Sequence, residues 1–329
     1  MLEAKTKPPL LVLVGPTAVG KTRLSLEIAR RFGCEIISGD SMQVYRGMDI
    51  GTAKASAAER QLVPHHLIDI HEPRHPFSVA EFQERVRALI ADIASRGKLP
   101  FIVGGTGLYV ESVCYNFQFT EVGSDPAFRQ EQEAFAERFG AQALHEKLRA
   151  VDPASAERLH ANDIRRVVRA LEVFHLSGMT LSASLAAQTK TSPYDLCLLG
   201  LTMERSLLYK RIEERIEQML ADGLVDEVRR LLAAGVPRDA TAMQGLGYKE
   251  LAGYLEGELS LEEAIVLLKR DTRRFAKRQL SWFRHMADIH WTDVTDPAKF
   301  SAQFQGIHAI IAGKFARAME YNQQQSPLK

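Results

Sequence analysis

The residues best suited to chemistry lie at positions 15–22, where the chain reads Gly-Pro-Thr-Ala-Val-Gly-Lys-Thr. Two glycines separated by four residues and followed by Lys21 and Thr22, between an apolar run and a helical pattern, are typical of a phosphate-binding loop. Backbone N–H groups of such a loop bind phosphate oxygens, Lys21 adds a positive charge, and the Thr22 hydroxyl suits Mg²⁺. The segment therefore predicts polyphosphate binding with Mg²⁺, but it identifies neither the polyphosphate nor the transferred group.

A carboxylate comes after the second apolar run of the chain. Asp40 lies just beyond Cys34–Ser38, at the sheet edge where we also expect the phosphate-binding loop. A carboxylate at this place can bind a metal ion, accept a proton or cap the following turn, and the residue type does not decide among them. The neighbouring Ser41 and Gln43 carry hydrogen-bonding groups that suit the edge of a nucleobase.

A further apolar run, Leu99–Val103, is informative because no carboxylate stands at its end. Many ATPases with a phosphate-binding loop carry a metal-binding Asp at the end of such a strand. Here the run continues into Gly104, Gly105 and Thr106. This pattern disfavours ordinary ATP or GTP hydrolysis. Its glycines allow close backbone approach to a ligand, or they form a tight turn that contacts no ligand.

Basic residues gather in two segments although the net charge of the chain is only +1. Residues 269–284 hold seven basic residues and one acid, interleaved with Phe275, Trp282 and Phe283, a combination that suits RNA phosphates and base stacking. The alternative is a solvated helix whose aromatic residues face the core. A smaller cluster, Arg165, Arg166 and Arg169, has acidic residues nearby, so a solvated helix face explains it equally well.

Positioning these groups requires an α/β fold. Apolar runs at 10–14, 34–38, 66–70, 99–103 and 194–201 predict strands, while 22–32 and 78–96 have helical spacing. This alternation predicts a parallel sheet flanked by helices, similar to P-loop kinases, with ligands at the carboxyl ends of the strands. Expected divisions are a core at 1–121 and 192–315, an all-helical insertion at 122–191, and a disordered tail at 316–329.

Composition excludes several other classes. The chain of 329 residues is 46% hydrophobic and 25% charged, without an apolar run long enough for a membrane span. Three scattered cysteines and no signal peptide predict a cytoplasmic protein without structural zinc. We interpret His65, His66, His71 and His75 as solvated loop residues, because no Cys or carboxylate pattern completes a metal site among them.

Six stretches together resemble bacterial members of the isopentenyl-tRNA transferase family, the tRNA dimethylallyltransferases. They span most of the chain in the family's order, at 15–22, 38–46, 49–54, 103–109, 243–250 and 272–279. The resemblance implies transfer of a dimethylallyl group from dimethylallyl diphosphate to N6 of the adenosine just 3′ of certain tRNA anticodons. Diphosphate leaves, and Mg²⁺ assists. The eukaryotic members' C-terminal zinc finger is missing here, because His285 and His290 lack paired cysteines.

The resemblance also implies roles for individual residues. Asp40 corresponds to the general base, Thr106 lines the channel where the substrates meet, Lys21 acts on the diphosphate, and Thr22 holds the metal. The diphosphate-binding residues are then Gly15, Pro16, Thr17, Ala18, Val19, Gly20, Lys21 and Thr22. With the basic segment included, the predicted contacts to the tRNA anticodon stem-loop are Asp40, Ser41, Met42, Gln43, Thr106, Arg129, Ile164, Arg165, Arg166, Val167, Val168, Gln244, Gly245, Tyr248, Arg273, Arg274, Lys277 and Arg278.

Three other functions remain open at this point. A small-molecule kinase with a P-loop would need a carboxylate for its metal and has little use for the basic aromatic segment. An adenylate isopentenyltransferase shares the donor but leaves the helical insertion without a purpose. The third is an RNA-binding module whose phosphate loop is regulatory. We expect no membrane contact, and no protein partner is evident from the sequence.

Overall fold

The computed structural model describes residues 7–119, 123–188 and 191–325. It divides into two compact units, one comprising Met1–Tyr115 and Ser192–Lys329 and the other Asn116–Thr191. The second unit is inserted in the sequence of the first. It begins at Asn116, whereas the sequence predicted an insertion from residue 122.

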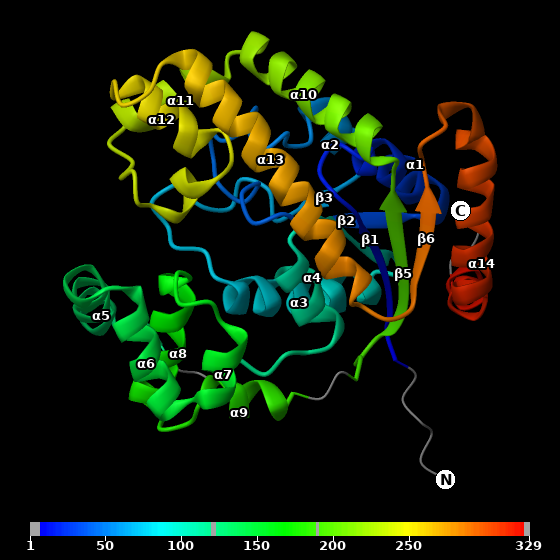
Figure 1. Ribbon diagram of the computed structural model, residues 1–329. Coiled ribbons are helices and arrows are strands. Elements are labelled where there is room, and N and C mark those ends of the chain that lie inside the picture. The colour runs from blue at the N-terminus through cyan, green and yellow to red at the C-terminus, as the bar shows by residue number, and fades with distance from the viewer. Residues whose placement is uncertain (1–6, 120–122, 189–190, 326–329) are drawn as a thin grey trace. The chain divides into compact units, whose positions relative to one another are not determined.

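A parallel sheet forms the centre of the first unit (Figure 1). Within the described residues it has six strands in the order β3-β2-β4-β1-β5-β6, namely β1 (Pro9–Val14), β2 (Cys34–Gly39), β3 (His65–His66), β4 (Leu99–Gly104), β5 (Asp195–Thr202) and β6 (Ile289–Asp293). The central strand β1 is an apolar run buried on both faces, as expected where helices cover both sides of a sheet. Val14 is in register with Gly104 and with Gly200, so the carboxyl ends of these strands lie at one edge.

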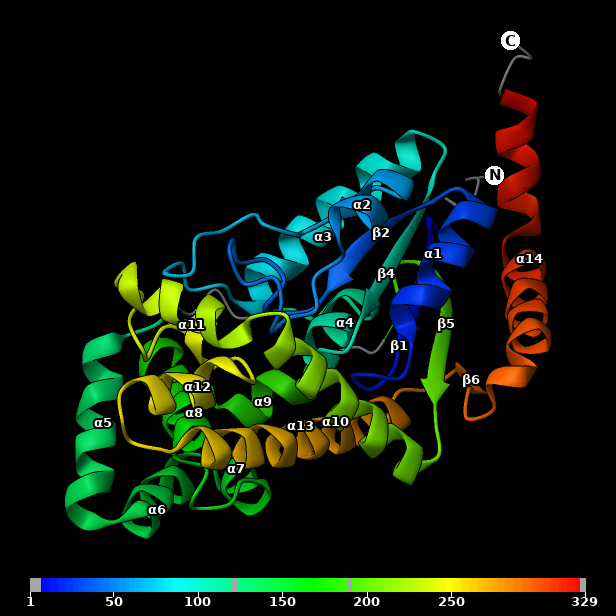
Figure 2. The ribbon, with the colours of Figure 1, turned by 90° about the horizontal axis from the view of Figure 1, so that it is seen from above.

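Helices cover both faces of this sheet (Figures 1 and 2). One face carries α1 (Lys21–Phe32) and α14 (Phe300–Gln325), which meet where the Phe32 and His308 rings lie 4.8 Å apart. The opposite face carries α3 (Val79–Ser95) and α4 (Gly107–Cys114). A short helix, α2 (Ala57–Leu62), precedes β3. The predicted parallel sheet flanked by helices is therefore confirmed.

A group of helices between β5 and β6 completes the first unit. It consists of α10 (Arg205–Ala221), α11 (Leu224–Ala233), the 3-10 turn η1 (Thr241–Gln244), α12 (Tyr248–Leu255) and α13 (Leu261–Arg284). Helix α13 begins with a capping box formed by Ser260 and Glu263. It lies beside α10, because Arg273 pairs with Glu213 at 2.6 Å. Figure 2 shows these two long helices next to each other.

Within its described residues the second unit contains helices and no strand, as the sequence predicted. Its helices are α5 (Pro126–Phe139), α6 (Ala141–Val151), α7 (Pro153–Arg158), α8 (Ile164–Ser177) and α9 (Leu181–Ala186). They enclose a small core of their own that includes Leu144, Leu148 and Val167. This unit therefore has a separate hydrophobic centre.

Three elements differ from the sequence-based expectation. The predicted strand at 66–70 ends after His66, because Leu67 and Asp69 have φ values of 61° and 57°, which no β-strand accommodates. Strand β6 was not predicted. The helical segment α14 continues past a kink at Phe315 to Gln325, whereas the sequence predicted a disordered tail from residue 316; residues 326–329 lie outside the described residues.

The described helices include none that is long and apolar enough to cross a lipid bilayer.

Candidate active site at the carboxyl edge of the sheet

The phosphate-binding loop lies between β1 and α1, as predicted. Ala18 and Gly20 adopt left-handed conformations, with φ values of 63° and 103°, which turn the chain into the helix. Lys21 Nζ folds back and donates to the carbonyl oxygens of Gly15 and Pro16, at 2.9 and 2.8 Å. A cavity of about 300 Å³, the first cavity, is lined by five residues of this loop: Thr17, Ala18, Gly20, Lys21 and Thr22. Val19, also a predicted ligand residue, instead buries its side chain in the core and does not line this cavity.

Positive charge is concentrated in the first cavity beyond what the sequence indicated. Arg211 and Arg215 of α10 line it together with Lys21. Burial, together with the nearby charge of Arg215, lowers the pKa of Lys21 to about 7. Burial likewise lowers the pKa of Arg215 below its usual range. Three basic side chains that line one partly buried cavity form a site for a polyanion, whose negative charge favours the protonated form of Lys21.

Oxygen donors also line the first cavity. They include the hydroxyl groups of Thr22, Ser25 and Ser38 and the carboxylate of Asp40. Mg²⁺ prefers oxygen ligands, usually one or two from protein together with water and phosphate oxygens. The residues present therefore fit Mg²⁺, with Thr22 as the predicted ligand.

Asp40 lies just beyond β2 and caps the next turn. Its Oδ1 accepts a hydrogen bond from Met42 N at 2.8 Å, so the capping interpretation holds for this oxygen. Burial raises the pKa of Asp40, although the Met42 N–H and the charge of Lys21 act in the opposite direction. A carboxyl group whose affinity for a proton is raised above that of an ordinary Asp is suited to proton transfer. Capping and proton transfer are thus compatible at this residue.

A second cavity, of about 520 Å³, adjoins the first. Both cavities are lined by Thr17, Ala18, Asp40, Thr52, Arg215 and Phe275. Asp40 therefore lies at the junction of a cationic cavity and a larger one. Eight predicted tRNA contacts besides Asp40 line the second cavity, namely Ser41, Met42, Thr106, Gln244, Gly245, Tyr248, Arg274 and Arg278.

The turn after β4 is joined to the phosphate-binding loop by a residue to which sequence reasoning assigned no role. Gln279 of α13 is buried; its Oε1 accepts from Thr17 N at 2.9 Å and its Nε2 donates to Gly105 O at 3.0 Å. A Cβ atom at Gly105 would lie 2.2 Å from Gln279 Nε2, and one at Gly104 would lie 2.3 Å from Gly39 O. The two glycines thus serve close packing as well as lining the first cavity.

Thr106 and Gln43 shape the turn that holds Asp40. Thr106 Oγ1 accepts from Ser41 N at 3.2 Å, which links α4 to the turn. The Gln43 amide is used internally, because Ser38 Oγ donates to its Oε1 at 2.8 Å and its Nε2 donates to Thr52 O at 3.2 Å. Gln43 lines the first cavity and is missing from the second. Its predicted tRNA contact has no support in this geometry, whereas those of Ser41 and Met42 stay predictions.

Glu227 of α11 organises a wall of the second cavity, a role that no sequence motif indicated. Its Oε2 accepts from the backbone N–H groups of Asp49 and Ile50, both at 2.9 Å. Its Oε1 accepts from Gly51 N at 3.1 Å and from the Tyr248 hydroxyl at 2.6 Å. The hydroxyl of Tyr248, a predicted tRNA contact, is thereby engaged within the protein. Two motifs that are distant in sequence, 49–54 and 243–250, meet at this carboxylate.

The basic helix α13 combines both interpretations that the sequence left open. Phe283 is buried in the core, and Arg273 is held by Glu213. In contrast, Arg274, Lys277 and Arg278 are exposed on the helix surface. Arg274 also pairs with Asp271, at 3.5 Å, but its side chain stays 64% exposed, whereas Arg273 is held by Glu213. All three exposed cations can therefore still reach phosphate groups in solvent.

In the helical unit, too, some predicted tRNA contacts are buried or paired within the protein and others are exposed. Val167 and Val168 belong to its hydrophobic core, so their side chains are not accessible to tRNA, and Ile164 packs against that core. Arg129 is bound through its guanidinium to the buried Glu172, at 2.7 and 2.9 Å. The side chains of Arg165 and Arg166 are exposed, and they remain predicted tRNA contacts.

Comparison with known proteins gives one family for nearly the whole chain. A family model described as "IPP transferase" matches residues 43–286, and one described as "Isopentenyl transferase" matches residues 8–72. A tRNA dimethylallyltransferase of Geobacillus thermodenitrificans is 53% identical over 305 residues, covering 93% of this chain and 96% of the relative. The protein of the same name from Bacillus subtilis is 51% identical over 309 residues, with coverage of 94% and 98%.

Solved structures agree with the sequence relatives. The full-length tRNA isopentenylpyrophosphate transferase of Bacillus halodurans is 50% identical, with a TM-score of 0.72 and coverage of 96% of this chain and 100% of the other. A eukaryotic dimethylallyltransferase acting on tRNA is 30% identical, with a TM-score of 0.79 and coverage of 94% and 79%. The phosphate-binding loop, the cavity junction at Asp40 and these relatives lead to one conclusion: the chain belongs to the IPP transferase family.

Proposed function

We propose that this protein transfers a dimethylallyl group from dimethylallyl diphosphate to N6 of the adenosine immediately 3′ of the anticodon in certain tRNAs. The observation that carries the proposal is the position of Asp40 where the two cavities meet. Its family relatives bear the names of enzymes with this activity. The donor occupies the first cavity and the adenine enters through the second.

The first cavity binds the diphosphate. N–H groups of the phosphate-binding loop and the charges of Lys21, Arg211 and Arg215 stabilise the negative charge that grows on the diphosphate as it leaves. Thr22 would hold Mg²⁺, which supplies further neutralisation of that charge. The dimethylallyl carbon then points toward Asp40 at the junction.

The second cavity places the acceptor nitrogen. The adenine must leave its stack to reach the junction, and Phe275 offers an aromatic surface in the shared wall. N6 attacks the allylic carbon, so an N–C bond forms and the C–O bond to diphosphate breaks, with its electron pair leaving on the diphosphate. Asp40 accepts the N6 proton.

The exposed cations favour a polymeric acceptor over free AMP. Arg274 and Arg278 line the second cavity and, with Lys277, continue onto the exposed surface of α13. A free nucleotide would fill the cavity but leave these charges without phosphate partners. A kinase function has less support, because no carboxylate comes directly after β4.

Asp40→Asn tests the proposal, because the amide keeps an oxygen for the Met42 N–H but cannot accept the N6 proton at neutral pH. We expect single-turnover transfer from radiolabelled dimethylallyl diphosphate to unmodified tRNA to slow by about 10²- to 10⁴-fold, with tRNA affinity nearly unchanged. The exposed Asp222→Asn on the C-terminal end of α10 is the matched control. Wild-type rates in the Asp40 variant, or efficient transfer to AMP and none to tRNA, would refute the proposal.

A further inference from the structure

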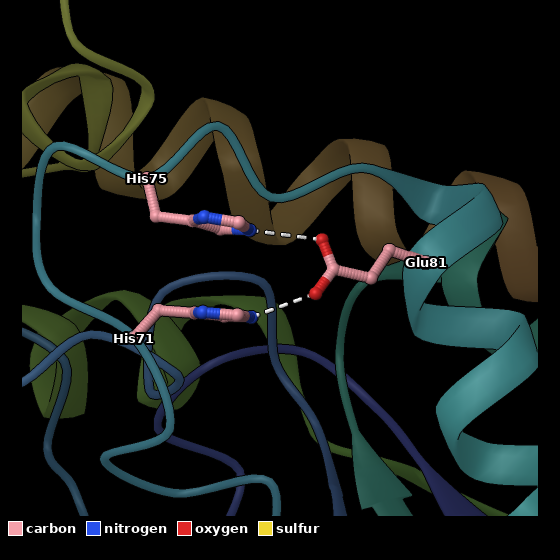
Figure 3. Close-up of side chains that lie close together, drawn as sticks. All are labelled: His71, His75 and Glu81. Atoms are coloured by element: carbon pink, nitrogen blue, oxygen red, sulfur yellow. Dashed lines mark hydrogen bonds and ion pairs between the residues drawn. The ribbon is translucent and has the colours of Figure 1, made fainter.

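Two histidines and a glutamate lie together (Figure 3), and none of them lines either cavity. The rings of His71 and His75 are stacked, with centroids 3.7 Å apart and an angle of 9° between the planes. His71 Nε2 lies 2.8 Å from Oε1 of Glu81, and His75 Nε2 lies 3.0 Å from Oε2. The sequence-based interpretation of these histidines as solvated residues without a carboxylate partner is therefore wrong for this pair.

The fold fixes all three residues through their backbones. His71 N donates to Val44 O at 2.9 Å, and Arg46 N donates to His71 O at 2.8 Å. His75 O accepts from the buried Tyr45 hydroxyl at 3.0 Å. Glu81 lies in the first turn of α3, where its N–H donates to the N-cap Ser78 Oγ at 3.2 Å. The cluster is thus built by the surrounding structure and does not depend on mobile surface side chains.

We propose that His71, His75 and Glu81 bind one divalent transition-metal ion, with Zn²⁺ as the best chemical match. The three residues each offer one ligand atom, and these atoms all lie within 4.8 Å of one another. Two imidazole nitrogens and one carboxylate oxygen form a set that Zn²⁺ accepts with water in the fourth position. Mg²⁺ strongly prefers oxygen donors, so this site discriminates against the ion expected in the first cavity.

With both imidazoles neutral, binding exchanges hydrogen bonds for metal bonds without a net change in protons. Each neutral imidazole that donates from Nε2 shifts its proton to Nδ1, which frees the Nε2 lone pair for the metal. The stacked rings then tilt so that the two lone pairs converge. Arg85 Nε also donates to Glu81 Oε1, at 2.8 Å, but its side chain is 45% exposed, and the guanidinium can return to solvent.

The ion would fasten the segment containing His71 and His75 to the beginning of α3. This segment pairs with the chain just beyond Asp40, since Asp69 N donates to Gln43 O at 3.2 Å and Ile70 N to Val44 O at 2.9 Å. The proposed role is accordingly structural: the metal stabilises the support of the Asp40 turn and takes no part in group transfer.

The test uses the full chain after treatment with a chelator. In excess Mg²⁺ we expect one Co²⁺ per chain to bind with the visible absorption of a tetrahedral site, and Zn²⁺ to displace it. His75→Ala and Glu81→Gln change partly exposed side chains, and each is expected to weaken Zn²⁺ binding by at least about tenfold. Zn²⁺ should raise the melting temperature of the wild type and leave that of both variants unchanged.

His290→Ala is the matched control, because this exposed histidine lies on β6 away from the cluster. Its Zn²⁺ affinity is expected to equal that of the wild type. Absence of saturable Co²⁺ or Zn²⁺ binding would overturn the proposal. Binding that survives in both cluster variants would overturn it as well, since the ion would then occupy other histidines of the chain.

Discussion

The carboxylate of Glu227 is expected to be the most sensitive single support of the site. It is buried, and each of its oxygens accepts two hydrogen bonds, from Asp49 and Ile50 on one side and from Gly51 and Tyr248 on the other. Glu227→Gln keeps the size of the side chain and replaces one oxygen with an NH₂ group. Whichever oxygen is replaced, at least one backbone N–H then faces another donor.

The number of donors left without an acceptor sets the expected cost. If the new NH₂ faces Gly51 and Tyr248, the tyrosine hydroxyl can rotate to accept, and one buried N–H remains unsatisfied. An unsatisfied buried group costs about 1–3 kcal/mol, and the remaining bonds weaken because the acceptor has lost its charge. We therefore expect Glu227→Gln to lower the free energy of unfolding by about 2–3 kcal/mol. Glu227→Ala, which removes the acceptor from all four donors, should cost about 3–5 kcal/mol.

Urea denaturation followed by circular dichroism measures the change. Glu214→Gln on α10 is the matched control: its side chain is 60% exposed and 3.8 Å from Lys210, so we expect a change within about 0.5 kcal/mol. Steady-state kinetics add a second readout, because residues 51 and 52 line the second cavity and tRNA KM should rise more than donor KM. An unfolding free energy of Glu227→Gln equal to that of the wild type would refute this reasoning.

Three further outcomes are expected. Gln279→Leu leaves the Thr17 N–H and the Gly105 carbonyl without partners. The KM for the donor should therefore rise about tenfold, equivalent to about 1.4 kcal/mol. An unchanged KM in a filter-binding transfer assay would contradict this expectation. The double variant Arg274→Ala, Lys277→Ala should reduce the salt slope of tRNA binding by up to about 2 units, whereas Arg273→Ala should mainly reduce stability because Arg273 pairs with Glu213. Glu35 accepts from Arg96, which lowers its pKa to about 2. Its ionised form therefore stabilises the fold fully above about pH 4.3, and this contribution disappears as the pH falls toward 2. Glu35→Gln should cost about 1–3 kcal/mol at pH 7, and its unfolding curve should approach that of the wild type in acid.

Local patterns made the ligand-binding edge predictable. The apolar run of β1 and the Gly-x₄-Gly-Lys-Thr spacing place the phosphate-binding loop without any knowledge of distant residues. Asp40 and Thr106 could be assigned to the same edge because each lies just beyond a strand of one parallel sheet. In these places a few adjacent residues determine the structure.

Residues that depend on long-range contacts escaped prediction. Gln279 and Thr17 are 262 positions apart, and Glu227 lies 176 positions from Gly51, so no local pattern links them. Arg211 and Arg215 share one face of α10 by their spacing. Because acidic residues stand next to them in the sequence, they did not appear there as a basic cluster. Strand β6 alternates poorly and is mostly exposed, which leaves no apolar run to mark it.

The close contact between Gly104 and Gly39 restricts how this site can change during evolution. Any side chain at 104 would place its Cβ atom 2.3 Å from the carbonyl oxygen of Gly39 and 2.6 Å from its Cα atom, at the carboxyl ends of two paired strands. Backbone atoms cannot rotate away as a flexible side chain would, so the two strands would have to separate. A single substitution of Gly104 by Asp therefore cannot introduce at this position the metal-binding carboxylate that many ATPases with a phosphate-binding loop carry. The packing that holds the sheet edge together thus also blocks the most direct single substitution that could change this prenyl-transfer site toward ATP hydrolysis.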